Sequence, residues 1–451
     1  MMRENDIDVN SEPITQPVDQ DDIKQKKLPD TSAAIHAAIC TLDDAGLSPN
    51  FIFSGDSVLH IAALNAFLEK MQNAGIPMCG IVLNSIPPNR VPQFSSEDVV
   101  SLPSERFRYI QNGIDCRCEK SGLSAKLVSA LENPVKGIHS NQVTAGRNAK
   151  ESECFYLIWP DHSLPTTELW EAAYSTGKAV RCILVEEGTG SYLSHKSVIR
   201  LNAAKAGKGI IYLKSLSKAL ISGIFERRRE KLLHKVSNVE RFGTFDISST
   251  GYLSPNKDFA KWMRTSLKKH SALTNSPAAV GRDFSSTIVF IATNFSELGP
   301  MDLELRVIEA VAKVVKDCGL KLYVRPHPRT QDTSCYKTLA VEIDHNPKIA
   351  FESILASSSS LPLATVGFCS SSQVLANALW DIPAFSVAKI LETISCQIRL
   401  NTKVIEAYVE RVGLFEERFK DCIIQISSEA DLKTRLSSLA SSTHSKSLPK
   451  D

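Results

Sequence analysis

The chain has 451 residues, a length that suggests about two or three domains. Its 52 basic and 50 acidic residues nearly cancel to a formal charge of +2, so no strong positive field draws it to nucleic acid. The eleven cysteines show neither the paired spacing of a zinc site nor the density of a disulfide framework. We therefore expect no metal cofactor and a reducing compartment.

Both ends of the chain are polar. We expect a disordered leader over residues 1–45, whose first thirty residues are mostly polar and charged, and a flexible Ser- and Lys-rich tail over 437–451. The leader lacks the apolar core of a signal peptide, and no later run approaches the length of a membrane span. These features predict a cytoplasmic protein.

Apolar runs alternate with helical patterns through residues 46–275. Such alternation is typical of an α/β domain with a parallel sheet. The strands expected here are Phe51–Phe53, Cys79–Leu83, Cys154–Trp159 and Ala179–Val185.

The alternation resumes over residues 285–400, after a linker placed near Thr274–Phe284, and predicts a second Rossmann-like domain. Its helices are expected at Met301–Asp317 and Ser371–Leu379, and its strands at Thr287–Ala292, Lys321–Val324, Ile349–Ile354, Leu361–Val366 and Ala384–Val387. Helical spacing from Lys403 to Glu417 predicts closing helices over residues 401–436.

The run Arg325-Pro-His-Pro-Arg329 follows a predicted strand, and its two prolines restrict the backbone on either side of His327. An imidazole held at a strand end can neutralise charge on a leaving phosphate, and Arg325 and Arg329 can add guanidinium donors. The alternative is a proline-shaped loop whose cationic side chains face solvent.

Three serines, Ser370, Ser371 and Ser372, lead from a predicted strand into a helix. The amide groups at a helix start, together with serine hydroxyls, can bind a phosphate. Ordinary helix capping is the competing interpretation, because any serine at this position can provide it.

Glu186, Glu187 and Gly188 follow the predicted strand Ala179–Val185. A carboxylate at the carboxyl end of such a strand can remove the proton of an acceptor hydroxyl. A solvated loop explains the same residues. A base in the first domain and a phosphate site in the second would act together across a cleft.

The stretch Phe225–Val236 is dense in charge. Its usual meaning is a solvated helix with ion pairs, and a peripheral contact with lipid head groups is the alternative. Walker, zinc-protease and esterase motifs do not occur in the sequence.

The motifs Glu186-Glu187-Gly188, His327-Pro328 and Ser370-Ser371-Ser372 occur in the order found in a known group of enzymes. They resemble the acidic-acidic-Gly, His-Pro and Ser-Ser/Thr motifs of the bacterial sialyltransferases and polysialyltransferases that use CMP-sialic acid. The resemblance spans about residues 45 to 400, and the order and strand-end placement of the motifs make it specific.

The resemblance implies a GT-B fold, with two Rossmann-like domains facing each other, and an inverting, metal-independent transfer to a glycan acceptor. It implies that Glu186 is the base, that His327 assists the departure of CMP and that two of the three serines bind the donor phosphate. Glu187 and Gly188 belong to the same motif. Asn294 ends the strand that opens the second domain, where such folds approach the nucleotide, but no motif supports it.

Two other functions stay open at this point. Capsular Kdo transferases are similar in their acidic-Gly triplet and His-Pro element, and they also use a CMP-activated acidic sugar. A non-catalytic protein that kept the fold and the nucleotide site is the second alternative.

Overall fold

The structure is a computed structural model of the full chain. It describes residues 31–55, 57–84, 98–111, 153–160, 169, 172–173, 175–185, 239–247, 253–273, 282–293, 301–328, 330, 333–339, 341–347, 349–368, 370–397 and 402–445.

The first half of the chain forms a six-stranded parallel sheet in the order β3-β2-β1-β4-β5-β6. The strands are β1 (Phe51–Gly55), β2 (Gly80–Asn84), β3 (Phe107–Gln111), β4 (Cys154–Pro160), β5 (Ala179–Val185) and β6 (Val239–Phe242). Helices α1 (Thr31–Asp44) and α2 (Val58–Asn73) pack in this half. The inner strands are buried apolar runs because helices cover a parallel sheet on both faces.

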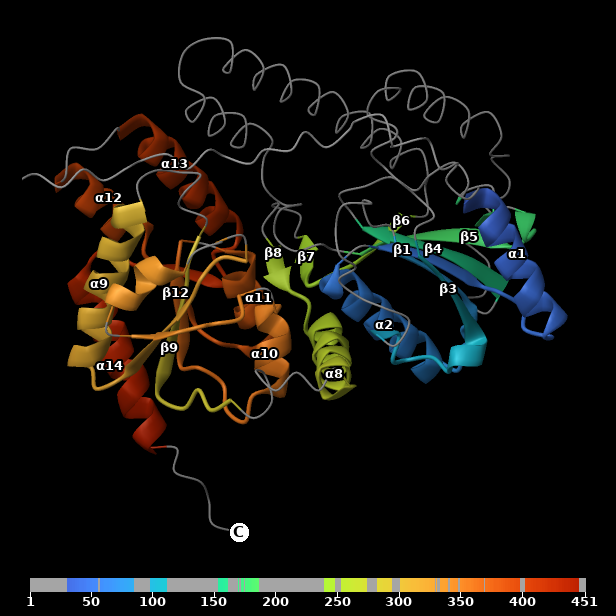
Figure 1. The fold of residues 1–451 in the computed structure, drawn as a ribbon, viewed down its shortest axis with the longest axis horizontal. Coiled ribbons are helices and arrows are strands. Elements are labelled where there is room, and N and C mark those ends of the chain that lie inside the picture. The colour runs from blue at the N-terminus through green and yellow to red at the C-terminus, as the bar shows by residue number, and fades with distance from the viewer. Residues whose placement is uncertain are drawn as a thin grey trace, which may run out of the picture.

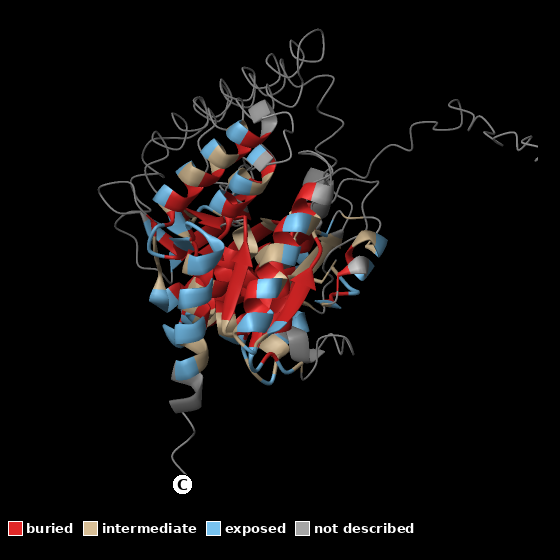
Figure 2. Ribbon diagram, turned by 90° about the vertical axis from the view of Figure 1, so that its left-hand side faces the viewer, coloured by how far each residue is buried: buried red, intermediate tan, exposed pale blue. Residues whose placement is uncertain are grey.

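The second half repeats the arrangement, with a parallel sheet in the order β11-β10-β9-β12-β13-β14. The strands are β9 (Thr287–Ile291), β10 (Lys321–Arg325), β11 (Glu342–Ile343), β12 (Ala364–Gly367), β13 (Ala384–Ser386) and β14 (Ile423–Gln425). Its helices are α9 (Met301–Asp317), α10 (Phe351–Ser357), α11 (Ser371–Trp380), α12 (Ala388–Gln397), α13 (Thr402–Arg418) and α14 (Glu429–Ser445). Figure 2 shows buried strands enclosed by helices whose outward faces are exposed.

Each sheet has the strand order of a Rossmann fold, in which the central strand is the first of the unit. Figure 1 shows the two units side by side, with the carboxyl-terminal helices around the second sheet. The prediction of two Rossmann-like α/β domains in a GT-B fold is therefore confirmed.

Helix α8 (Lys257–Leu273) lies between the units, next to the small hairpin of β7 (Phe245–Ile247) and β8 (Leu253–Pro255) (Figure 1). It packs against α2 of the first unit and against α10 and α11 of the second. Arg264 of α8 donates a hydrogen bond to the carbonyl oxygen of Leu379 in α11. This helix, which precedes the predicted linker, thus packs on both units.

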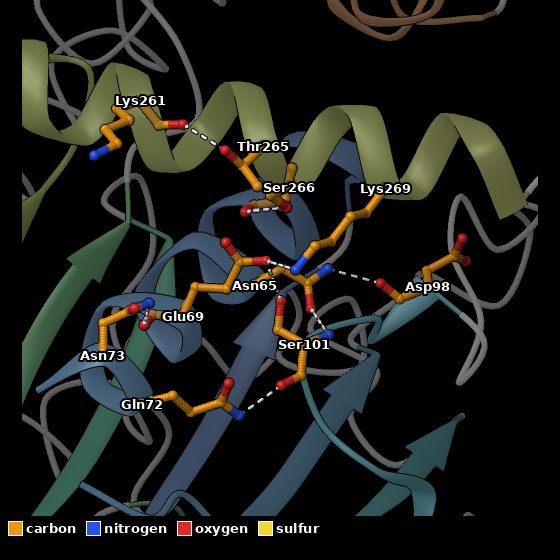
Figure 3. Close-up of polar contacts among 11 residues, drawn as sticks. Asn65, Glu69, Gln72, Asn73, Asp98, Ser101, Lys261, Thr265, Ser266 and Lys269 are labelled. Carbon is orange, nitrogen blue, oxygen red and sulfur yellow. Dashed lines mark hydrogen bonds and ion pairs between the residues drawn. The ribbon is translucent and has the colours of Figure 1, made fainter. Parts of the chain in front are cut away.

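Polar contacts fix α8 to α2 (Figure 3). Lys269 Nζ lies 2.6 Å from Glu69 Oε1, and the same carboxylate oxygen accepts from Ser101 Oγ at 3.1 Å. Ser266 Oγ donates to the carbonyl oxygen of Ala62 at 3.0 Å. Glu69 is buried, so these contacts supply the partners that a desolvated carboxylate needs.

The structure corrects two predicted boundaries and one predicted strand. The leader predicted over 1–45 is wrong from residue 31 onward, because Ile35 and Leu42 bury the apolar face of α1. The flexible tail predicted from residue 437 is wrong up to residue 445, where α14 ends. The strand predicted at Ile349–Ile354 is helix α10, because a short apolar run does not reveal its period.

Candidate active site

The carboxyl edge of the second sheet gathers the segments that follow three neighbouring strands. Arg325 of β10 and Gly367 of β12 both pair with Ile291 of β9, so the three strands end level with one another. The strand order reverses at β9, with β10 and β11 on one side of it and β12 to β14 on the other, and Rossmann-like sheets bind ligands at such a point. His327 follows β10, and Ser370 follows β12.

Close packing of the chain at this edge requires a glycine. A Cβ at Gly367 would lie 2.7 Å from the carbonyl oxygen of Ile291 and 2.9 Å from Gln373 Oε1. Those separations are shorter than van der Waals contact, so a side chain would push β12 and α11 away from β9. The spacing between the Ser370 and β9 segments therefore depends on Gly367.

The segment around His327 forms a closed turn. Pro326 is buried, His327 is half-buried and Pro328 is exposed. The amide of Thr330 donates to the carbonyl oxygen of His327 at 2.8 Å, which fixes the backbone after the strand. His327 thus lies in a backbone turn directly after β10, and the role predicted for its imidazole stays a prediction.

Arg325 makes a different set of contacts from those predicted. It is 4% exposed and forms a buried ion pair with Asp344. Its Nη2 donates to the carbonyl oxygens of Pro347, at 3.2 Å, and Ile349. The guanidinium also lies 5.6 Å from the ring centroid of Phe351. These contacts favour a structural role for Arg325 over phosphate binding, because its donors are already directed into the protein.

Ser370 is the N-cap of α11. Its Oγ accepts from the amide of Gln373 at 3.3 Å, and its own amide donates to Gln373 Oε1 at 3.0 Å, which completes a capping box. Gln373 is held in turn by a bond from its Nε2 to the carbonyl oxygen of Phe385. The capping interpretation of Ser370 is therefore confirmed. It leaves the Ser370 hydroxyl able to donate elsewhere.

Ser372 bonds to a buried acid. Its side chain hydrogen-bonds to Glu352 of α10, which also lies near the Arg325 guanidinium. Glu352 is 3% exposed, and burial raises the pKa of its carboxyl. The three adjacent serines thus have different surroundings, and the hydroxyl of Ser372 is engaged by the protein interior.

Glu304 is a further buried acid at this edge, and the sequence analysis did not single it out. It lies in the first turn of α9, accepts from the amide of Thr293 at 2.8 Å and accepts from the Tyr336 hydroxyl at 3.0 Å. Burial raises the pKa of Glu304 to about 7. Its spacing from Val307, Ile308 and Val311 places it on the apolar stripe of α9, and that pattern could have revealed it.

A sequence model of the alpha-2,8-polysialyltransferase family matches residues 127–389, more than half of the chain. The chain belongs to the alpha-2,8-polysialyltransferase family. It is accordingly a glycosyltransferase, and a nucleotide-sugar donor and a glycan acceptor are its substrates. The match covers all three motifs of this polysialyltransferase-family chain, from the acidic triplet to the serines.

Solved structures similar to this polysialyltransferase-family chain include a polymerase and an epimerase. The wall teichoic acid polymerase TagF is 12% identical over 89% of this chain and 90% of its own, with a TM-score of 0.35. The UDP-GlcNAc 2-epimerase from Methanocaldococcus jannaschii is 11% identical over 87% of this chain and 91% of its own, with a TM-score of 0.40. A search of curated proteins found no match in sequence. The fold assignment rests on the two sheets themselves.

Five residues proposed for the site lie outside the described residues. They are Glu186, Glu187, Gly188, Asn294 and Arg329. Glu186 follows directly after Val185, the last residue of β5. The roles predicted for these residues in the polysialyltransferase-family chain stay predictions.

Two features are absent from the described part of this polysialyltransferase-family chain. Its His, Cys, Asp and Glu side chains include no group of three placed to hold a metal ion. No helix within the same ranges combines the length and the apolar character needed to cross a membrane.

Proposed function

We propose that the chain transfers sialic acid from CMP-sialic acid to a hydroxyl of a glycan acceptor, with inversion and without a metal ion. One observation carries the proposal: His327 and Ser370 follow strands that end level on either side of β9. An imidazole and the amide groups of a helix start are two kinds of donor that suit a leaving phosphate. Family membership supports glycosyl transfer.

In the proposed reaction, the acceptor oxygen attacks the anomeric carbon of sialic acid while the bond from that carbon to the CMP phosphate oxygen breaks. Glu186 takes the proton of the acceptor hydroxyl as the new glycosidic bond forms. His327 donates a hydrogen bond to the departing phosphate, so the negative charge that develops on CMP is stabilised. Attack from the face opposite CMP inverts the anomeric configuration.

Among the serines, we assign the phosphate to Ser370 and Ser371. Ser370 uses an oxygen lone pair for the Gln373 amide and keeps its own hydrogen to donate. Ser372 is less suited, because its side chain bonds to the buried Glu352. The amides of the first turn of α11 add further donors.

The proposed location is the cytoplasm. The eight cysteines within the described ranges are free thiols, four of them buried, which suits a reducing compartment. A peripheral membrane contact through residues 225–236 falls outside the described residues and stays a prediction.

The test is a transfer assay that gives the enzyme CMP-sialic acid or CMP-Kdo with sialylated and galactosyl acceptors, and identifies products by mass. We expect turnover with CMP-sialic acid, and a loss of about 10²- to 10⁴-fold in kcat for Glu186→Gln and His327→Ala. His345→Ala is the matched control for the second variant, because His345 is exposed and follows the neighbouring strand β11.

Three results would contradict the proposal. Turnover with CMP-Kdo alone would show that the donor is CMP-Kdo and not CMP-sialic acid. If neither donor is consumed, the proposed transferase activity is wrong. Full rates in both Glu186→Gln and His327→Ala would contradict the roles assigned to Glu186 and His327, but not the transferase activity.

A further inference from the structure

Glu304 is a carboxyl group in an apolar environment. It is 0% exposed, and Leu303, Val307 and Ile308 around it on α9 are also fully buried. Burying a carboxyl group costs free energy unless hydrogen bonds compensate for the lost water. The partners of Glu304 therefore indicate what the protein gains from keeping an acid here.

Those partners come from two different segments at the carboxyl edge of the sheet. One carboxylate oxygen accepts from the amide of Thr293, two residues beyond β9, and lies 3.4 Å from the Thr293 hydroxyl. The other oxygen accepts from the hydroxyl of Tyr336, in the short helix Ser334–Thr338 that follows the His327 turn. Glu304 thus joins the segment after β9 to the segment after β10.

The connection continues to His327. The side chain of Thr330 hydrogen-bonds to Tyr336, and the amide of Thr330 donates to the carbonyl oxygen of His327 at 2.8 Å. Tyr336 is completely buried, so its hydroxyl has little access to water as a substitute partner. A continuous series of hydrogen bonds therefore runs from His327 through Thr330, Tyr336 and Glu304 to Thr293.

We infer that Glu304 is a positioning residue of the donor site, which holds the His327 turn at a fixed separation from the segment after β9. The inference rests on the proposed function, because it assigns these segments to donor binding. Glu304 acts through His327 and Thr293 and need not touch the donor.

The protonation state of Glu304 determines the stability of the hydrogen bonds that join the His327 turn to Thr293. The carboxylate form suits its two donors, but burial disfavours its charge. If the segments open and admit water, the carboxyl group regains its ordinary acidity, so opening becomes easier as the pH rises through about 7. The protonated form can donate to Tyr336, whose own hydrogen then turns toward Thr330.

Few other charged groups influence the protonation of Glu304. Among the described residues, Tyr336 is the titratable group that faces Glu304, and Cys335 interacts with Tyr336 in turn. Burial and the neighbouring acid raise the pKa of Tyr336, so it keeps its proton. Within the same ranges, β10, α12 and α14 pack against α9 and contribute no charge to the surroundings of Glu304.

The experiment compares the full-length wild type with Glu304→Gln, Tyr336→Phe and the control Glu309→Gln, which changes an exposed acid on the same helix. The first readout is amide hydrogen exchange of peptides covering 326–339. Between about pH 6 and about pH 8, exchange in the wild type relative to Glu304→Gln should rise about tenfold, since the glutamine variant cannot ionise. Tyr336→Phe should exchange faster at both values, and Glu309→Gln should follow the wild type.

The second readout is the KM for CMP-sialic acid over the same range. We expect the wild-type KM to rise about threefold to tenfold as Glu304 ionises, because the site loosens and gains a negative charge against an anionic donor. The rise should be much smaller in Glu304→Gln, while the pH dependence of kcat remains. A purely structural role for Glu304 would lower stability without changing this pH profile.

Equal exchange ratios at both pH values, or an unchanged KM profile in Glu304→Gln, would overturn the inference. Failure of the proposed function gives a different result. The wild type would then consume neither donor, and the exchange readout would still decide whether Glu304 holds the two segments together.

Discussion

Removing Asp344 should destabilise the protein strongly, because it would leave the Arg325 guanidinium buried without its counter-charge. The two side chains are 4% and 6% exposed, so water cannot replace the lost carboxylate. After Asp344→Ala, the carbonyl oxygens of Pro347 and Ile349 would remain as acceptors. Breaking a buried ion pair in this way costs about 3 to 5 kcal/mol, and we expect a loss of that size in the free energy of unfolding.

The assay is chemical denaturation followed by circular dichroism, with Asp317→Asn as the control. Asp317 pairs with Lys433 at 3.1 Å, but the two side chains are 46% and 51% exposed, so its loss should cost less than about 1 kcal/mol. The double variant Arg325→Met with Asp344→Leu should recover most of the stability, since it replaces the buried pair with apolar groups.

This reasoning fails if Asp344→Ala costs no more than the surface control. It also fails if Arg325→Met keeps the wild-type stability and loses donor binding. That second result would show that Arg325 binds the donor phosphate, as the sequence suggested, and that the contacts with Asp344 are incidental.

Two further predictions concern Glu304 and Ser370. The pKa of Glu304 is raised from 4.5 to about 7, so its contribution to stability is fully present below pH 4.5 and is lost as the pH rises through 7. The wild type should lose about 3 kcal/mol of unfolding free energy between pH 4.5 and pH values above 7, and Glu304→Gln should not show this loss in denaturation curves. The same pH dependence in the wild type and in Glu304→Gln would contradict this. Ser370→Ala should cost about 1 kcal/mol by thermal unfolding, because it removes the cap of α11, whereas Ser370→Asp should retain stability; no loss in the alanine variant would contradict the capping role.

The strands at the centre of each sheet were predictable because burial on both faces makes them continuous apolar runs. Thr287–Ile291 and Cys154–Pro160 are examples, and their predicted limits agree with the structure to within one residue. The edge strand β11 was missed because Glu342–Ile343 has no pattern of its own and is defined by pairing with β10. Pairing between distant segments leaves no local mark in the sequence.

The candidate site was predictable where a residue type is unusual for its position. Two prolines around His327 and three serines before a helix are such signals, and the structure brings their segments to one sheet edge. The ion pair of Arg325 was not predictable, since Asp344 approaches it only after β10 and β11 have paired. Glu304 could have been found from its place on the apolar stripe of α9, although an acid in the first turn of a helix ordinarily indicates an interaction with the helix dipole at the surface.

The packing of α8 on both units sets a limit on how the chain can be divided. A cut at the predicted linker would leave α8 attached to the first half, and the surfaces of α10 and α11 that it covers would be exposed on the second. The first half would in turn expose the face of α8 that receives them. These surfaces carry apolar side chains of one buried cluster, such as Met263 on α8 and Leu375 on α11. Exposed apolar surface promotes aggregation, so neither Rossmann unit is a sound choice for expression by itself.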